Sequence, residues 1–439
     1  MLTALGVTLL LGLPLTIGGW LGRQIWRQRL PRRLVWLWLA LAVVLALTVA
    51  LLATHPGLFP MHGFSGPSDA NGYSLTAKRL TGDSWRYISG GQAVHAGRSL
   101  DDGQRSYSGY CALVGLLPSS CLIPFQTLLA QLALAAMLTL AWRLTRSGLA
   151  VTLAGLCVAC QPEFAAWHTA VMTESLYMSA VCCNALFAWS AAHSRRRWLW
   201  LPLTLAWIAL TATLRPTGWI QVPAVALYWS LTLPRGRWPR LLWSALVCAS
   251  FVGLAALAGG DAIQRESPAR KLYDGEVVWR EPLWRVEMPR EARAPETLGE
   301  GLLYGLRHPV ASCWLVCKRL AMMFLRIRPT FSLKHNLFLL LCQLPLTVCG
   351  LASLWVWRRR TVAKALGAML LAHALVVALT FNDNDGRFTL YILPLLMTVA
   401  VSGVTLALRR LIMGVAGGSG GRGGVGVVPA GGCRAPSRC

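Results

Sequence analysis

Residues 34–53 of this chain read LVWLWLALAVVLALTVALLA, an uncharged apolar run that directly follows Arg32 and Arg33. About 20 apolar residues are enough to cross the hydrocarbon core of a bilayer as an α-helix. Basic residues gather at the cytoplasmic ends of such helices. The stretch therefore predicts a spanning helix whose N-terminal end faces the cytoplasm.

Apolar runs of this kind recur along the whole chain, and we expect about eleven spanning helices. They lie at approximately 1–22, 34–53, 124–142, 148–161, 167–190, 198–213, 217–233, 241–260, 337–356, 364–381 and 388–408. The first run ends in Gly-Gly-Trp rather than at a small-residue cleavage site, so we interpret it as a retained span. With 55% hydrophobic and 13% charged residues, the composition exceeds what a soluble protein could bury. We predict an all-α polytopic membrane protein.

The distribution of basic residues predicts how the protein is oriented in the membrane. Basic clusters follow every second run, at 23–33, 143–146, 195–197, 235–240, 358–364 and 409–410. The positive-inside rule then places the N-terminus outside and the C-terminus inside. All 17 Asp and Glu residues fall in segments that this topology places at the outer side, so carboxylate chemistry is expected there. Since the excess of +25 is spread over these loops, the charge indicates membrane topology and no nucleic-acid partner.

Two outer segments are long, at about 54–123 and 261–336. The second mixes both signs of charge from Asp261 to Arg307, as a solvated surface does, and then continues into the apolar stretch Val310–Leu325. Two charged residues interrupt that stretch, so we predict an interfacial amphipathic helix. A disulfide between Cys111 and Cys121, both on the predicted outer side, stays open.

The first outer segment carries three candidate functional residues, Asp69, Tyr73 and Tyr110. Asp69 precedes an apolar-periodic stretch, so helix capping explains it equally well. Three more candidates, Glu163, His168 and Glu174, lie where two neighbouring spans meet the outer side.

An ionisable group close to the membrane is a functional hypothesis by default. The alternatives are that Glu174 only begins a helix and that His168 is an interfacial polar residue.

Two arginines on predicted outer turns, Arg215 and Arg387, are not explained by the topology. Asp385 stands beside the second. The planar fork of a guanidinium suits bidentate binding of a phosphate. The alternative is an arginine that snorkels to the lipid headgroups, which we favour for Arg215 taken alone.

Together these residues resemble the GT-C class of polytopic glycosyltransferases, in particular the bacterial protein-mannosyltransferase-like and lipid A aminoarabinose transferase-like branch. The matching residues are Asp69 and Tyr73, Thr-Glu-Ser-Leu at 173–176, Leu-Arg-Pro at 214–216, and Gly-Arg-Phe at 386–388 with Pro394. The resemblance covers about 34–408. It divides the chain into an additional N-terminal span and basic loop at 1–33, a GT-C-like domain at 34–410, and a Gly-rich cytoplasmic tail at 411–439 that we expect to be disordered.

The chain departs from that family in two places. Asn71 stands where a second acid of the first loop is usual, which puts metal use in doubt. These enzymes also commonly begin on the cytoplasmic side, without the additional first span.

The resemblance implies transfer of a sugar from a polyprenyl-phosphate donor to an acceptor, with inversion, on the periplasmic side of a bacterial inner membrane. The acceptor would be an envelope glycan, a lipid or a protein. Asp69 would be the base, and Arg387, Arg215 and then Lys318 would bind the donor phosphate. Substrate-binding residues would be Tyr73, Tyr110, Glu163, His168, Glu174 and Asp385. Use of Mg²⁺ or Mn²⁺ stays open, because no ligand set is evident.

Three alternatives to sugar transfer remain. One is a transporter or flippase for a lipid-linked sugar, which would favour charges at the bilayer midplane and repeated halves. Another is an O-antigen polymerase or ligase, which would rely on a late outer loop. The last is a purely structural membrane protein.

Overall fold

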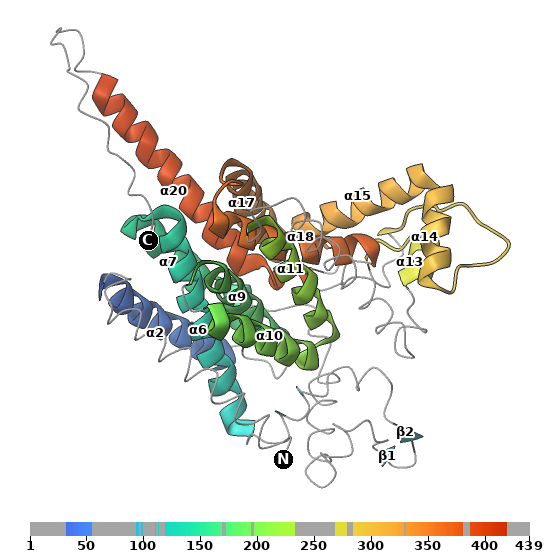
Figure 1. Cartoon of the computed structure of the whole chain (residues 1–439), viewed down its shortest axis with the longest axis horizontal. Coiled ribbons are helices and arrows are strands. Elements are labelled where there is room, and N and C mark those ends of the chain that lie inside the picture. The colour runs from blue at the N-terminus through green and yellow to red at the C-terminus, as the bar shows by residue number, and fades with distance from the viewer. Residues whose placement is uncertain are drawn as a thin grey trace.

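The computed structural model describes residues 32–54, 94–95, 98–99, 110, 113, 119–168, 173–194, 197–232, 268–278, 284–328, 331–380 and 387–418. These residues are mostly helical (Figure 1). The described part also contains irregular segments and two antiparallel two-residue strands, β1 (Val94–His95) and β2 (Arg98–Ser99).

Most of the described helices form one bundle. Its elements are α2 (Arg32–Thr54), α6 (Ser119–Thr145), α7 (Gly148–Ala159), α8 (Pro162–Trp167), α9 (Thr173–His193), α10 (Arg197–Leu214), the 3₁₀-helix η2 (Pro216–Ile220), α11 (Gln221–Thr232), α16 (Leu333–Phe338), the π-helical turn η5 (Leu339–Gln343), α17 (Leu344–Val356), α18 (Thr361–Leu379), α19 (Arg387–Leu390) and α20 (Leu393–Gly418).

Six helical stretches in the described part of the chain are long and apolar enough to cross a membrane. They are 33–52, 123–145, 173–193, 333–356, 361–379 and 393–412. The protein is therefore a helical membrane protein, as the composition predicts. The predicted runs at 1–22 and 241–260 lie outside the described residues.

Prolines mark two of the places where the helices depart from the predicted runs. The run at 148–161 contains the 12-residue helix α7, which is shorter than a full span, and Pro162 begins the separate helix α8. The helix predicted at 167–190 corresponds to α9, which begins at Thr173. The run at 217–233 is divided into η2, which begins at Pro216, and α11, because proline favours the first turn of a helix.

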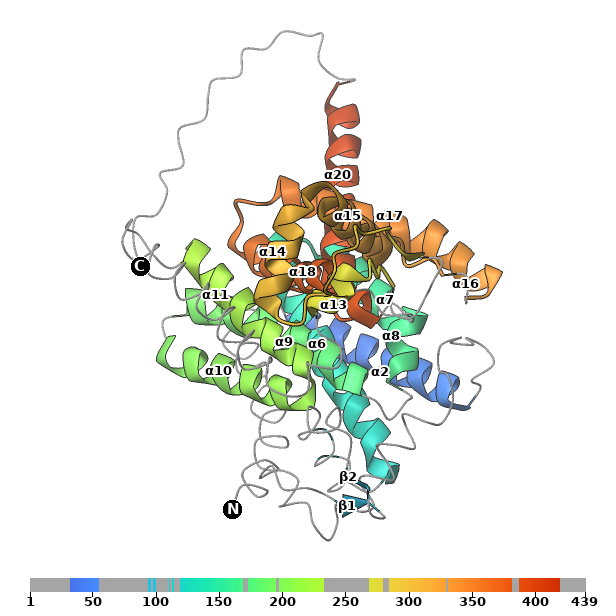
Figure 2. The same ribbon diagram turned by 90° about the vertical axis from the view of Figure 1, so that its right-hand side faces the viewer.

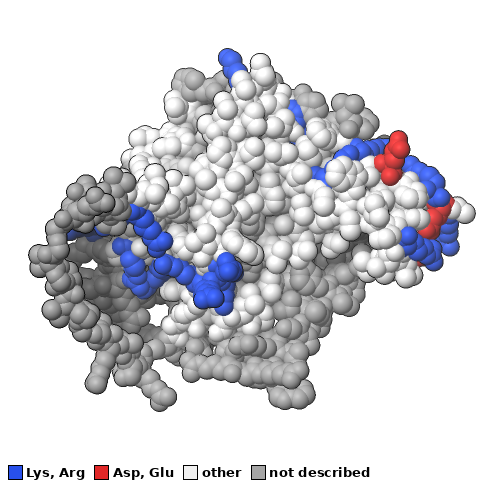
Figure 3. All heavy atoms as spheres, turned by 90° about the horizontal axis from the view of Figure 1, so that it is seen from above, with Lys and Arg blue, Asp and Glu red and all other residues white. Residues whose placement is uncertain are grey.

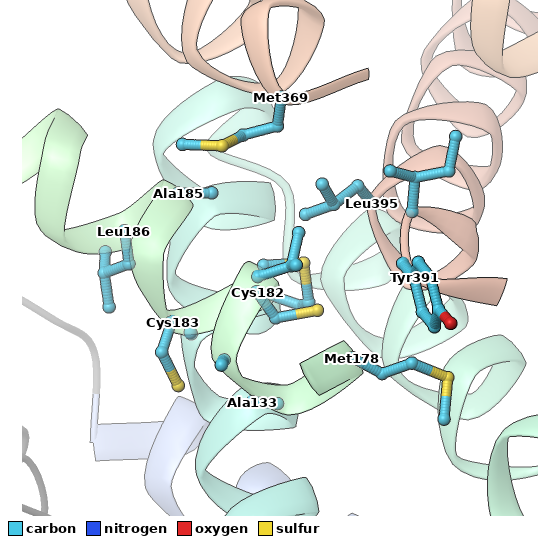
Figure 4. Close-up of a cluster of buried hydrophobic side chains, with 14 of the residues drawn as sticks. Ala133, Met178, Cys182, Cys183, Ala185, Leu186, Met369, Tyr391 and Leu395 are labelled. Atoms are coloured by element: carbon cyan, nitrogen blue, oxygen red, sulfur yellow. The ribbon is translucent and has the colours of Figure 1, made fainter. Parts of the chain in front are cut away.

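Helix α9 is the centre of the bundle and is buried along almost its whole length. It packs between α6 and α10, and also against α18. Figure 4 shows Cys182 and Cys183 of α9 among the side chains of Ala133, Met369 and Leu395. Small side chains let helices approach closely, and the resulting van der Waals packing helps to hold helices together in lipid.

A second, smaller unit consists of α13 (Pro268–Tyr273), α14 (Leu298–Arg307) and α15 (Pro309–Leu325). It has its own apolar core, which includes Val277, Tyr304 and Leu315. In Figure 2 this unit lies in front of the bundle, and α15 contacts α18. The helix predicted over 310–325 is confirmed as α15.

The two ends of the molecule differ in charge. In Figure 1, α20 extends to the upper left and α13–α15 lie at the right. In Figure 3, only Lys and Arg colour the left end, whereas Asp and Glu appear at the right among further basic side chains. Since the predicted topology places the acids at the outer side, we expect the side of α13–α15 to face outward.

Candidate functional site at the helix ends

A buried ion pair joins the start of α9 to the end of α10. Arg215 follows α10 in an extended conformation, and its Nη1 lies 2.5 Å from Oε1 of Glu174 and 3.0 Å from Oγ1 of Thr173. Arg215 is 8% exposed and Glu174 is 1% exposed. The arginine therefore does not snorkel to the headgroups, because a carboxylate holds it inside the protein.

Two tyrosines extend this pair. The guanidinium carbon of Arg215 lies 5.1 Å from the ring centre of Tyr391, a cation–π distance. Tyr391 meets Tyr177 edge to face, with ring centres 4.6 Å apart, and the hydroxyl of Tyr177 donates to the carbonyl of Thr217 at 2.7 Å. Segments 173–177, 215–217 and 387–391, which are distant in sequence, thus converge on one cluster.

A polar network runs from this cluster into the bundle. Tyr177 contacts Nε2 of His373 at 3.1 Å and accepts from the side-chain amide of Gln221 at 3.3 Å. The amide of Asn184 donates to Gln221 at 2.9 Å. Asn184 is seven residues beyond Tyr177 on α9, so the network extends about two helical turns, or roughly 10 Å.

A second buried ion pair lies on α8. Nη1 and Nη2 of Arg326 donate to the two carboxylate oxygens of Glu163 at 2.6 and 2.9 Å, and His335 contacts Oε1 of Glu163 at 3.0 Å. Arg326 ends α15 in the left-handed region, with φ 56°, and Nη1 also donates to Gln343 of η5. Burial alone would raise the pKa of Glu163, but Arg326 and His335 hold it well below its usual range.

Neither Arg326 nor His335 was expected from the sequence. The sequence did contain a reason to consider Arg326. Like Arg215 and Arg387, it is a basic residue in a predicted outer segment, as Arg328 also is. The two ion pairs are linked through α15 and α19. The hydroxyl of Thr389 donates to the carbonyl of Met323, three residues before Arg326, and Thr389 is two residues before Tyr391.

His168 and Tyr110 lie together near the second pair. The amide of Gln126 donates to the carbonyl of His168 at 3.3 Å, and the hydroxyl of Tyr110 lies 3.5 Å from the oxygen of the same amide. Burial lowers the pKa of His168 to about 4, so its imidazole is neutral at pH 7. His168 is thus a buried residue within a network, and not an interfacial one.

The other predicted site residues are placed less fully. Lys318 lies on α15, with its ammonium 5.3 Å from the ring centre of Trp314, and no described contact joins it to the Arg215 pair. Arg387 begins α19, but its side chain lies outside the described residues. So do Asp69, Tyr73, Asp385, Cys111 and the side chain of Cys121. Within the described ranges, no group of three or more His, Cys, Asp or Glu residues could hold a metal ion.

Comparison of the chain with protein-family models, with curated proteins and with solved structures finds no match.

Proposed function

We propose that this chain is a membrane glycosyltransferase that moves a sugar from a polyprenyl-phosphate donor to an acceptor at its predicted outer face. The observation that carries the proposal is the convergence of Glu174, Arg215 and the 387–391 segment on one cluster. These segments hold three of the motifs on which the resemblance to GT-C enzymes rests.

The chemistry of the reaction fits such a cluster. The acceptor oxygen or nitrogen attacks the anomeric carbon while the bond from that carbon to the phosphate oxygen breaks, and the acceptor proton passes to Asp69. Negative charge then builds up on the leaving phosphate, where preorganised cations lower the barrier. Arg215 is held in place by Glu174 and Tyr391, and Arg387 starts the helix that leads to Tyr391.

The test is sugar transfer by the purified full chain in proteoliposomes, with a panel of radiolabelled polyprenyl-phosphate sugars and extracted envelope acceptors. We expect one donor to be consumed, and Asp69→Asn to abolish consumption while the variant still inserts into the membrane. Full activity of Asp69→Asn would remove Asp69 from the mechanism.

Transport of a lipid-linked sugar is the second candidate, and the polar network inside the bundle favours it. His373 is an ionisable residue within a spanning helix, and such residues often mark a transport path. The same proteoliposomes separate the two functions. A transporter moves the intact donor to the other leaflet, whereas a transferase releases polyprenyl phosphate.

A further inference from the structure

The helix α15 has a buried face and, opposite to it, an exposed apolar face. One face packs inside the protein through Leu315, Arg319, Met322 and Met323. The opposite face is exposed and carries Val310, Cys313, Trp314, Cys317 and Ala321. These five residues follow each other at steps of three, one, three and four, so they form a stripe along about 16 Å of one helix face.

The neighbouring helix α14 also exposes apolar side chains, in a segment whose mixed charges predict a solvated surface. Leu302, Leu303 and Leu306 are exposed there, with Leu306 at 76% and Val310 of α15 at 83%. Tyr304, on the opposite side of α14, is buried in the core of the small unit. Large apolar side chains gathered on neighbouring helices are rarely left to water, so we expect α14 and α15 to be covered.

We infer that the exposed apolar face of α14 and α15 is a docking surface for the lipid of the adjacent bilayer leaflet. The chain passes from α15 through the short connection 326–332 into α16, η5 and α17, a candidate span with exposed Leu333, Leu337, Leu341 and Val348. The exposed apolar face of α15 is thus followed closely in the chain by a candidate span that also exposes apolar side chains.

The charges of α15 fit the same occupant. The helix contains no Asp or Glu, and Lys318 at the edge of the stripe lies over the ring of Trp314. A tryptophan at the interface with a lysine reaching past it toward headgroup phosphates is a common membrane anchor.

Two buried arginines connect the proposed lipid-binding helix α15 to the rest of the protein. Arg319, on the inner face of α15, donates to the carbonyls of Lys271, Glu276 and Ala378, and so ties the helix to α13 and α18. Arg326, at the end of α15, is paired with Glu163 of α8. The lipid-facing helix is therefore fixed to the bundle at both of these positions.

The test is photo-crosslinking of the full chain in nanodiscs of phosphatidylethanolamine and phosphatidylglycerol. Benzoylphenylalanine replaces Leu306, Val310 or Trp314, and, as controls, the exposed Arg293 or Glu296 of the same small unit. We expect lipid adducts at the first three positions at least tenfold above the controls. Adducts at the control level would show a water-facing surface, and chain-to-chain adducts would show a second copy as the occupant. Either result would overturn the inference.

The native chain offers a second measurement that needs no substitution. Cys313 and Cys317 lie on the stripe and are free and exposed. In nanodiscs, a charged water-soluble maleimide should label both at least tenfold more slowly than in the same chain unfolded in a strong denaturant. Equal rates in the two conditions would also overturn the inference.

Discussion

A buried guanidinium–carboxylate pair stabilises the protein only while both of its partners are present. Glu163 accepts hydrogen bonds from Arg326 on both oxygens, and both residues are about 1% exposed. Removing one partner of such a pair leaves an uncompensated buried charge, which lowers the free energy of unfolding by about 3–5 kcal/mol. Replacing both partners with apolar groups often leaves that free energy nearly unchanged. The pair is therefore better tested as a unit than by single substitutions.

We predict that Glu163→Gln destabilises the protein by about 3 kcal/mol, because Arg326 is then left without its carboxylate. The double variant Glu163→Gln with Arg326→Met should recover at least half of that loss. Unfolding in detergent by a mild denaturant gives the free energies. Additive losses in the double variant would mean that the two residues are not coupled.

The same carboxylate predicts a dependence of stability on pH. The pKa of Glu163 in the folded protein is well below the value of about 4.5 for a free glutamate. The unfolded chain therefore takes up a proton first as the pH falls. The stability that the pair supplies is complete above about pH 4.5 and is lost as the pH falls further toward the folded-state pKa.

We expect the difference in unfolding free energy between the wild type and Glu163→Gln to shrink from pH 4.5 to 3. Thermal unfolding across this range measures it. A difference that grows as the pH falls from 4.5 to 3 would have the wrong sign for an ionised Glu163.

At the scale of elements, the turn after α10 sets the position of Arg215. Gly218 of η2 lies so close to α10 that an added Cβ would stand 2.3 Å from the carbonyl oxygen of Thr211. This contact is with backbone, which cannot move aside as a flexible side chain can. The absence of a side chain at 218 therefore allows η2 to fold back against α10, with Thr217 bonded to Tyr177.

We predict that Gly218→Ala destabilises the protein by about 1–3 kcal/mol, as overpacking does, and lowers sugar transfer more than tenfold. Gly367→Ala on α18 is the matched control, because nothing lies within 4 Å of its added Cβ. There the exchange should be neutral or stabilising by up to about 1 kcal/mol. Equal effects of the two substitutions would show that the close approach at Gly218 does not matter.

At the scale of the whole molecule, the distribution of charge predicts which end faces the cytoplasm. A fluorescent protein fused after the C-terminus should fluoresce, because it stays in the cytoplasm, and alkaline phosphatase inserted after Glu296 should be active outside. The opposite pattern would reverse the topology and place Arg215 at the inner side.

Sequence and structure differ most where contacts are distant in the chain. Hydrophobic runs and basic clusters are local properties, so the helical membrane class and most helix positions could be predicted. Glu174 and Arg215 could each be identified, but their pairing spans 41 residues and depends on how α9 and α10 pack. The pairing of Glu163 with Arg326 spans 163 residues, and no local pattern in the sequence indicates that these two residues meet.

The most direct test of the account is the rate of donor consumption by the wild type and two matched arginine variants in proteoliposomes. Arg215→Gln removes the charge at the proposed site, and thermal unfolding first checks that this variant is folded, because Glu174 loses its partner. Arg409→Gln makes the same change on an exposed arginine of α20, at the predicted inner end. We predict that Arg215→Gln lowers the rate at least 100-fold and that Arg409→Gln keeps the wild-type rate. Equal rates for the two variants, or no consumption of any polyprenyl-phosphate sugar by the wild type, would contradict the account.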